Sequence, residues 1–284
     1  MVRALSPVHG KTLSFLFKRG KSRQTKTFLS LEHIEPLNIA LLLIVGVVAS
    51  VINVVAGGGS YLTLPLLIFT GLPPGVANGT NRVGILAGNL FSAVKFARIG
   101  QIKALDFLYF CLPATLGGVL GSWAATHMDD RHLRVVLAVL MLFGSWTVIR
   151  KPSTGPKSSV GRAWSYPLFT GVGAYAGFIQ AGTGFFSLAA TSMLGYDLKR
   201  GNAIKTLMNL CLTVPALFIF WHKSMVHWSC GLALAAGMSV GGLIGVRVSE
   251  GSKPESLRKM VALAIAISAV AIVYPLVFGQ ESDL

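Results

Sequence analysis

Residues 37–60 read LNIALLLIVGVVASVINVVAGGGS, an apolar run without a charged side chain that ends in three consecutive glycines before Ser60. A helix that crosses a bilayer needs about 20 predominantly apolar residues, so this run is long enough to span a membrane. Further runs of the same kind follow it, each between charged or turn-forming stretches. Together they lie near residues 37–56, 77–97, 104–126, 132–149, 166–194, 202–221, 228–248 and 257–277.

The composition agrees with a membrane protein. Of the 284 residues, 53% are hydrophobic and 12% are charged, whereas about 25% of the residues of a soluble domain are charged. The net charge of +15 would also suit a nucleic-acid-binding protein. However, seven of the 25 Lys and Arg residues lie within residues 1–26, and most others lie between the apolar runs, as expected when basic loops set membrane orientation. We therefore predict an all-α, polytopic protein of the lipid bilayer with no nucleic-acid partner.

The two halves of the chain resemble one another after a shift of 124 residues. The shift superimposes glycines and polar residues at equal depth, which shared hydrophobicity alone does not explain, so we predict an internal duplication with four apolar segments in each copy. The matched pairs include Gly58/Gly182, Gly71/Gly195, Asn78/Asn202, Gly117/Gly241 and Gly121/Gly245. The expected parts are a basic, disordered tail (1–35), a first repeat (36–150), a linker (151–164), a second repeat (165–278) and a C-terminal tail (279–284).

The tail at residues 1–35 is basic and has no acidic residue before Glu32. A disordered tail is the favoured interpretation. A transit peptide, which is also Arg- and Ser-rich and poor in acids, is the alternative, and an over-long start of the chain is another.

The first segment of each repeat is interrupted by glycine, at residues 56–60 (AGGGS) and 180–184 (QAGTG). Glycine weakens a helix interior by about 1 kcal/mol per residue. Non-helical backbone at membrane depth persists only inside protein or along a wet cavity. Paired glycine-interrupted segments point to a transporter's binding site. Close helix packing through small residues is the alternative, and it is the favoured interpretation for Gly117, Gly121 and their partners.

The distribution of Lys and Arg predicts which loops face the cytoplasm. Loops 95–103 and 150–164 are basic and are expected inside, whereas 127–130 carries two aspartates and is expected outside. In the second half, 195–200 and 247–259 are expected inside. This places both ends of segment 166–194 on one side, so that the segment returns as a hairpin and the repeats are inverted. A full crossing at 166–194 is the alternative, and inversion conflicts with the basic N-terminal tail, which it would put outside.

Two cations, Arg82 and Lys205, lie inside apolar segments, although no acidic residue lies in the middle of any segment. A cation in the membrane costs roughly 2.5–3.5 kcal/mol on insertion scales and usually has a partner. A bound anion could be that partner. The alternative is that the long side chains reach the lipid headgroups.

The helix that starts after each glycine break offers unpaired N–H groups and a positive dipole end, which bind anions. Asn and Thr side chains near the breaks would complete the site, although each such side chain can also be an interhelical hydrogen-bond partner. The candidate substrate-binding residues are Gly58, Gly59, Ser60, Asn78, Thr80, Asn81, Arg82, Gly182, Thr183, Gly184, Asn202, Lys205 and Asn209.

Catalytic and metal-binding motifs do not occur in the sequence. The three cysteines, Cys111, Cys211 and Cys230, lie in or beside apolar runs without a CxxC pattern, and there is no HExxH motif. We predict neither an enzyme nor a metal or cofactor site.

Short motifs ordered along the chain carry a family resemblance. They are AGGGS at 56–60, GLP at 71–73, ANGTNR at 77–82 and FAR at 96–98, with a looser second copy in GTG at 182–184 and GYD at 195–197. From about residue 37 to 278 the chain resembles the TauE/SafE family, also called the sulfite exporter or toluenesulfonate-uptake permease family. Members commonly have Lys where Arg82 stands, and the long basic tail is not typical of them.

The resemblance implies a duplicated transporter of small sulfur-containing or organic anions. We therefore expect a secondary transporter, an exporter of sulfite, sulfonates or related organic anions, that binds its substrate between the two broken helices in the plasma (inner) membrane. An anion channel and a non-transporting membrane assembly protein are the alternatives. The expected partners are a small anion and the lipid bilayer, and homo-oligomerisation stays open.

Overall fold

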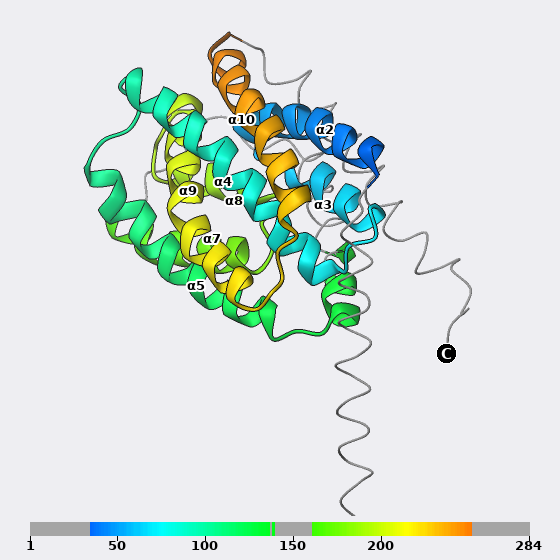
Figure 1. The fold of residues 1–284 in the computed structure, drawn as a ribbon. Coiled ribbons are helices and arrows are strands. Elements are labelled where there is room, and N and C mark those ends of the chain that lie inside the picture. The colour runs from blue at the N-terminus through cyan, green and yellow to red at the C-terminus, as the bar shows by residue number, and fades with distance from the viewer. Residues whose placement is uncertain (1–34, 137, 140–160, 252–284) are drawn as a thin grey trace, which may run out of the picture. The chain divides into compact units, whose positions relative to one another are not determined.

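A computed structural model describes residues 35–136, 138–139 and 161–251 (Figure 1). The described residues are helical and contain no strand, so the all-α prediction is confirmed. The expected tail (1–35, except Glu35), residues 151–160 of the linker, most of run 132–149, run 257–277 and the C-terminal tail (279–284) lie outside the described residues. The elements are α2 Pro36–Val55, α3 Ser60–Phe69, α4 Pro74–Arg98, a π-helical turn η1 Phe107–Cys111, α5 Leu112–Thr126, a 3₁₀ turn η2 Arg162–Trp164, α7 Ser165–Phe178, α8 Thr183–Met193, α9 Leu198–His222 and α10 Trp228–Gly251.

Four helices in the described part of the chain are long and apolar enough to cross a membrane. They are Pro36–Val55, Phe107–Thr126, Leu198–His222 and Trp228–Ser249. Helix α4 is 25 residues long but contains the polar run NGTNR at 78–82 in its first half, and it is not among the four. By length and composition, these helices agree with the prediction of an integral membrane protein.

Local sequence explains where several helices begin and end. Helix α4 begins with Pro74, whose missing N–H costs nothing in a first helical turn. Helix α9 begins after Asp197, whose carboxylate accepts a hydrogen bond from the backbone N–H of Arg200 at 2.7 Å. Helices α3 and α8 are each followed closely by a glycine with positive φ, Gly71 at +90° and Gly195 at +81°. The short helices α3 and α8 therefore each lie between a glycine interruption and a glycine turn.

Helices α4 and α9 pack side by side in opposite directions (Figure 1). A Cβ atom on Gly79, near the start of α4, would lie 1.9 Å from the carbonyl oxygen of Met225, just after α9 ends. Arg200, at the start of α9, bonds to Asp106, beyond the end of α4, at 2.6 Å. Both helices have 25 residues, and their bounds differ by the 124-residue offset at each end.

The other helix pairs meet along glycines. A Cβ on Gly117 or Gly121 of α5 would lie 2.0 or 1.9 Å from carbonyl oxygens of α7. A Cβ on Gly241 of α10 would likewise lie 2.1 Å from the carbonyl oxygen of Val47 in α2. The expected close packing at these glycines is confirmed, and it joins α5 of one half to α7 of the other, and α10 to α2.

Helices α7 and α8 form a hairpin. The Phe110 ring lies 5.0 Å from the Phe169 ring near the start of α7 and 5.7 Å from the Tyr196 ring just after α8. The chain therefore leaves the Phe110 end of the bundle and returns to it.

Helices α2 and α3 also form a hairpin, which starts from the opposite end of the bundle and returns to it. Helix α2 runs parallel to α10, because Leu43 lies against Gly237 and Val47 against Gly241. Helix α10 begins at the loop that packs on Gly75, and α3 also delivers the chain to Gly75. The loop around Asp130 joins this end through a 3.0 Å hydrogen bond from the Gly75 backbone N–H to the Asp130 carboxylate.

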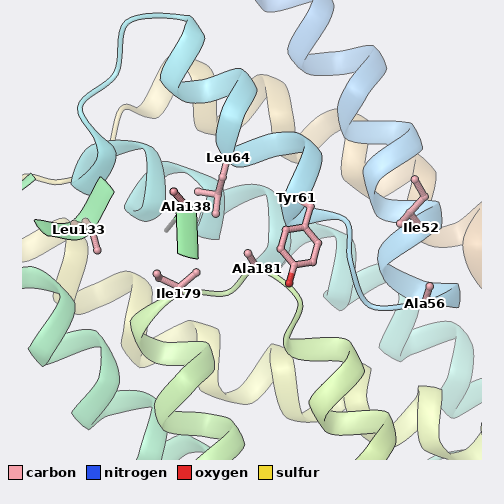
Figure 2. Packing of buried hydrophobic residues seen from close by; sticks show 8 residues of the cluster. All are labelled: Ile52, Ala56, Tyr61, Leu64, Leu133, Ala138, Ile179 and Ala181. Carbon is pink, nitrogen blue, oxygen red and sulfur yellow. The ribbon is translucent and has the colours of Figure 1, made fainter. Parts of the chain in front are cut away.

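The two interruptions meet in a buried apolar cluster (Figure 2). Its members come from α2 and the residue after it, from α3, from the helical residues that begin at Asp130 after α5, and from the chain between α7 and α8: Ile52, Ala56, Tyr61, Leu64, Leu133, Ala138, Ile179 and Ala181. The cluster brings together residues that are more than 120 positions apart in sequence. It packs the two interruptions against each other and so positions the site described in the next subsection.

Candidate functional site

The two interruptions touch through their backbones. The Gly184 N–H donates a hydrogen bond to the Gly57 carbonyl oxygen at 3.2 Å. A Cβ on Gly57 would lie 2.2 Å from the Gly184 Cα, and a Cβ on Gly184 would lie 2.0 Å from the Gly57 Cα. Gly57 also has φ of +82°, a conformation that costs most L-residues about 1–2 kcal/mol. Only glycines allow the two segments to cross this closely.

Tyr61 of α3 closes one side of the crossing. Its side chain is fully buried, its ring stacks on Phe185 of α8 at 6.5 Å between centroids, and its hydroxyl lies against Gly182, where a Cβ would be 2.1 Å away. Figure 2 shows the hydroxyl pointing to the chain that follows Ala181. Ser60 and Thr183, which begin α3 and α8, are also buried at the crossing.

Arg82 of α4 is fully buried and bonds to the last turn of α7. Its Nη1 donates to the Ala176 carbonyl at 3.4 Å, and its Nη2 donates to the Gly177 carbonyl. The guanidinium carbon lies 4.5 Å from the centre of the Phe220 ring of α9. No carboxylate in the described part of the chain pairs with Arg82.

Lys205 of α9 makes the corresponding contacts with the last turn of α2. Its ammonium lies 2.8 Å from each of three oxygens, the Asn53 carbonyl, the Val54 carbonyl and the Asn202 side-chain Oδ1. The Lys205 side chain is fully buried, and again no described carboxylate pairs with it.

The cation of each half therefore lies at the helix end of the other half. The last carbonyls of a helix lack intrahelical donors and carry its negative dipole end, so a cation there is stabilised. Asn78 extends the set at α7, because its Nδ2 donates to the Phe178 carbonyl at 2.8 Å. Sequence reasoning placed both cations at depth but offered only an anion or the headgroups as partners. The interrupted helices themselves, whose last carbonyls need donors, were the signal for this arrangement.

The remaining predicted residues divide between the crossing and the helix interfaces. Asn81 accepts a 2.6 Å hydrogen bond from Thr63 of α3, whereas Thr80 accepts one from the His227 backbone N–H at 2.8 Å and so joins α4 to the start of α10. Asn209 is buried in α9. Several buried polar atoms of α4, α9 and the chain between α7 and α8 have no hydrogen-bond partner within the structure: Asn78 Oδ1, Asn81 Nδ2, Arg82 Nε, Gln180 Oε1, Thr206 Oγ1 and Asn209 Oδ1.

A second polar feature lies at the Phe110 end of the bundle. A cavity of about 190 Å³ is lined by Lys103, Leu105, Asp106, Tyr109, Phe110, Tyr196 and Arg200. Arg200 pairs there with Asp106 at 2.6 Å and donates to the Gln101 carbonyl. Asp106 also accepts a 2.7 Å hydrogen bond from the Lys103 backbone N–H. This ion pair ties the loop after α4 to the start of α9. The described residues contain no group of three His, Cys, Asp or Glu side chains suited to a metal ion.

We expect Asp106→Asn to lower the thermal unfolding midpoint, because it leaves the nearly buried Arg200 guanidinium without its carboxylate. Removing one partner of a buried pair costs about 3–5 kcal/mol, and the side chains of Arg200 and Asp106 are 12% and 5% exposed. The measurement is the unfolding midpoint of the purified protein in detergent.

The control for that variant is Asp129→Asn, at the other end of the bundle. His132 forms a hydrogen bond with Asp129 that holds the pKa of its carboxyl below the ordinary value, but both side chains are more than half exposed. Exposed pairs contribute little, so this midpoint should stay unchanged. Equal effects of the two substitutions would contradict a structural role for the Asp106–Arg200 pair.

Comparison with known proteins adds the family. Residues 42–272 match the family model described as sulfite exporter TauE/SafE. A "Probable membrane transporter protein" of Haemophilus influenzae is 29% identical over 83% of this chain and 94% of its own length. The "Probable membrane transporter protein YfcA" of Escherichia coli K12 is 26% identical over 90% and 97%. No solved structure matches the chain. This chain is a membrane transporter of the sulfite exporter TauE/SafE family, and not an enzyme.

Proposed function

We propose that this protein is a secondary transporter that exports small anions, such as sulfite, sulfonates or related organic anions, and binds them where the two interrupted helices cross. The observation that carries the proposal is the pair of fully buried cations, Arg82 and Lys205, beside the Gly57–Gly184 contact without a described carboxylate partner. Two embedded positive charges favour a negative substrate, because a buried charge without a counter-charge is costly.

Candidate donors for the substrate lie in α4 and α9, the helices that carry these cations. Arg82 retains Nε, and Asn81 retains Nδ2, as buried donors without protein partners. The Thr206 hydroxyl is also buried without a protein partner. All three N–H groups of Lys205 already bond to protein oxygens, so Lys205 acts on the substrate through its charge. The backbone at the starts of α3 and α8 adds two positive dipole ends, so Gly58, Gly59, Ser60, Gly182, Thr183 and Gly184 complete the proposed site.

The architecture proposed for transport is an inverted duplication. In this architecture, the antiparallel helices α4 and α9 are equivalent helices of two repeats, because both their first and their last residues differ by 124 positions. The α2–α3 and α7–α8 segments are then re-entrant hairpins that enter from opposite sides and meet near the midplane. Inverted repeats with discontinuous helices at the midplane support alternating access by movement of one repeat against the other.

The sulfur oxyanion is proposed as substrate from the description of the matching family model, sulfite exporter TauE/SafE. The guanidinium of Arg82 suits it chemically, because its planar fork can bind two oxyanion oxygens at once. The curated relatives are described as membrane transporters without a named substrate. Substrate identity therefore needs a direct test.

Anion binding should appear as thermal stabilisation of the purified full-length protein. A ligand at 100 times its Kd stabilises by about 2.7 kcal/mol, which is a rise of roughly 5–10 °C in the unfolding midpoint at this size. We expect sulfite or small sulfonates to produce such a rise. Carboxylates of similar size should act more weakly, and choline should have no effect.

The same rise should vanish in Arg82→Met and persist in Arg98→Met. Arg98 lies in the last turn of the same helix but is exposed, so it controls for a general salt effect on a basic protein. An equal rise in both variants, or no rise with any anion, would contradict binding at the crossing.

A further inference from the structure

The Lys205 ammonium lies in a cage made only of protein oxygens. The two carbonyls at the end of α2 and the Asn202 side-chain oxygen are each 2.8 Å from it. An ammonium has three N–H donors, so each donor has one acceptor. The side chain is 0% exposed, and no described carboxylate pairs with it. The cage is neutral, and Lys205 supplies its positive charge.

Three neutral oxygens at the carbonyl end of a discontinuous helix are also the ligands that a small metal cation takes in a transporter. In secondary transporters with discontinuous helices, unwound carbonyls and half-helix C-terminal ends coordinate the coupling Na⁺. Here α2 is the discontinuous helix, and it ends just before Ala56 and Gly57. Its last carbonyls accept hydrogen bonds from the Lys205 ammonium, which is part of α9.

The other half repeats the arrangement with a different side chain. The end of α7 directs the Ala176 and Gly177 carbonyls at the Arg82 guanidinium, and the Phe178 carbonyl accepts from Asn78. Both interrupted helices therefore end on a cation carried by the partner half.

We propose that Lys205 is a tethered cation in the position of a coupling sodium ion, so that transport needs no alkali-metal ion. It follows that removing the Lys205 side chain creates a site for a free monovalent cation at the end of α2. The statement about transport rests on the proposed function, whereas the statement about the ion site does not.

The ion site is tested with purified Lys205→Ala and Lys205→Met in buffers of equal ionic strength. Alanine leaves room for an ion among the three oxygens, whereas methionine fills the room with an uncharged chain of similar length. In choline chloride, both variants should unfold at lower temperature than the wild type. In NaCl or methylammonium chloride, the Lys205→Ala midpoint should rise by about 5 °C, and the Lys205→Met and wild-type midpoints should stay where they were.

A Lys205→Ala midpoint that is indifferent to Na⁺, K⁺ and methylammonium would overturn the ion site. So would an equal rise in Lys205→Met, because the ion would then bind elsewhere.

Transport by the wild type gives an independent decision, even when Lys205→Ala does not fold. Proteoliposomes with choline in place of Na⁺ on both sides should transport the anion within twofold of the rate in Na⁺. A strict requirement for Na⁺ would overturn the tethered-cation proposal and leave anion transport intact. Absence of transport of any anion would contradict the proposed function, and the thermal measurements would still decide the ion site.

Discussion

Gly184→Ala should lower the unfolding midpoint by roughly 2–12 °C and abolish transport. The new Cβ would lie 2.0 Å from the Gly57 Cα and 2.8 Å from the Gly57 carbonyl oxygen, so the two interruptions must separate. Overpacking of this kind costs about 1–3 kcal/mol, and each kcal/mol shifts the midpoint by about 2–4 °C in a chain of this length. The same separation breaks the hydrogen bond from the Gly184 N–H to the Gly57 carbonyl.

Two matched glycines show whether the close crossing is responsible. Gly171 of α7 is exposed, and a Cβ at this position would have no neighbouring atom within 4 Å, whereas Gly71 has positive φ but equally open surroundings. Gly171→Ala should leave stability unchanged or slightly raised, since alanine favours helices. Gly71→Ala should lower the unfolding midpoint only through the strain of positive φ, because the added Cβ would meet no neighbouring atom. A Gly184→Ala protein as stable and active as Gly171→Ala would mean that the segments do not cross at these glycines.

Arg82→Met should reduce transport by about 100-fold or more, whereas Arg82→Lys should retain most of it. Methionine leaves the Ala176 and Gly177 carbonyls without their donor and removes the charge beside the crossing. Truncating one member of a buried charged hydrogen bond costs about 2–5 kcal/mol. Lysine keeps the charge but loses the planar fork, so we expect a weaker apparent affinity for the anion.

Initial transport rates in proteoliposomes check this prediction, with Arg98→Met as the control from the exposed end of α4. The amount of reconstituted protein and its unfolding midpoint are measured in parallel, so that a folding defect is separated from a transport defect. Equal rates for Arg82→Met and Arg98→Met would remove Arg82 from the mechanism.

Periodic and compositional features of the sequence predicted much of the fold. Long apolar runs predicted the helices, and Gly117, Gly121 and Gly241 predicted close helix contacts because small residues at equal spacing let backbones approach. Charged residues of the described loops lie in two groups in the structure, and the side of the membrane that each group faces stays a prediction. One group contains Asp106 and Arg200, and the other contains Gly75 and Asp130.

Features that depend on tertiary contacts were beyond the sequence. The partners of Arg82 and Lys205 are backbone carbonyls, which no residue type identifies, and they come from the opposite half of the chain. The Gly57–Gly184 contact joins positions 127 apart, so only the packed structure reveals it. Thr80, predicted as a substrate ligand, accepts a backbone hydrogen bond at the start of α10, and its role in binding stays a prediction.

Counterflow in proteoliposomes tests the central claim, that a small anion is carried through the crossing of the two interrupted helices. Labelled sulfite or a small sulfonate is supplied outside, with or without the same unlabelled anion inside. We predict saturable uptake that the internal anion accelerates and that Arg82→Met abolishes. Uptake no greater than in protein-free liposomes for every anion, or a linear flux indifferent to the internal anion as in a channel, would contradict the account.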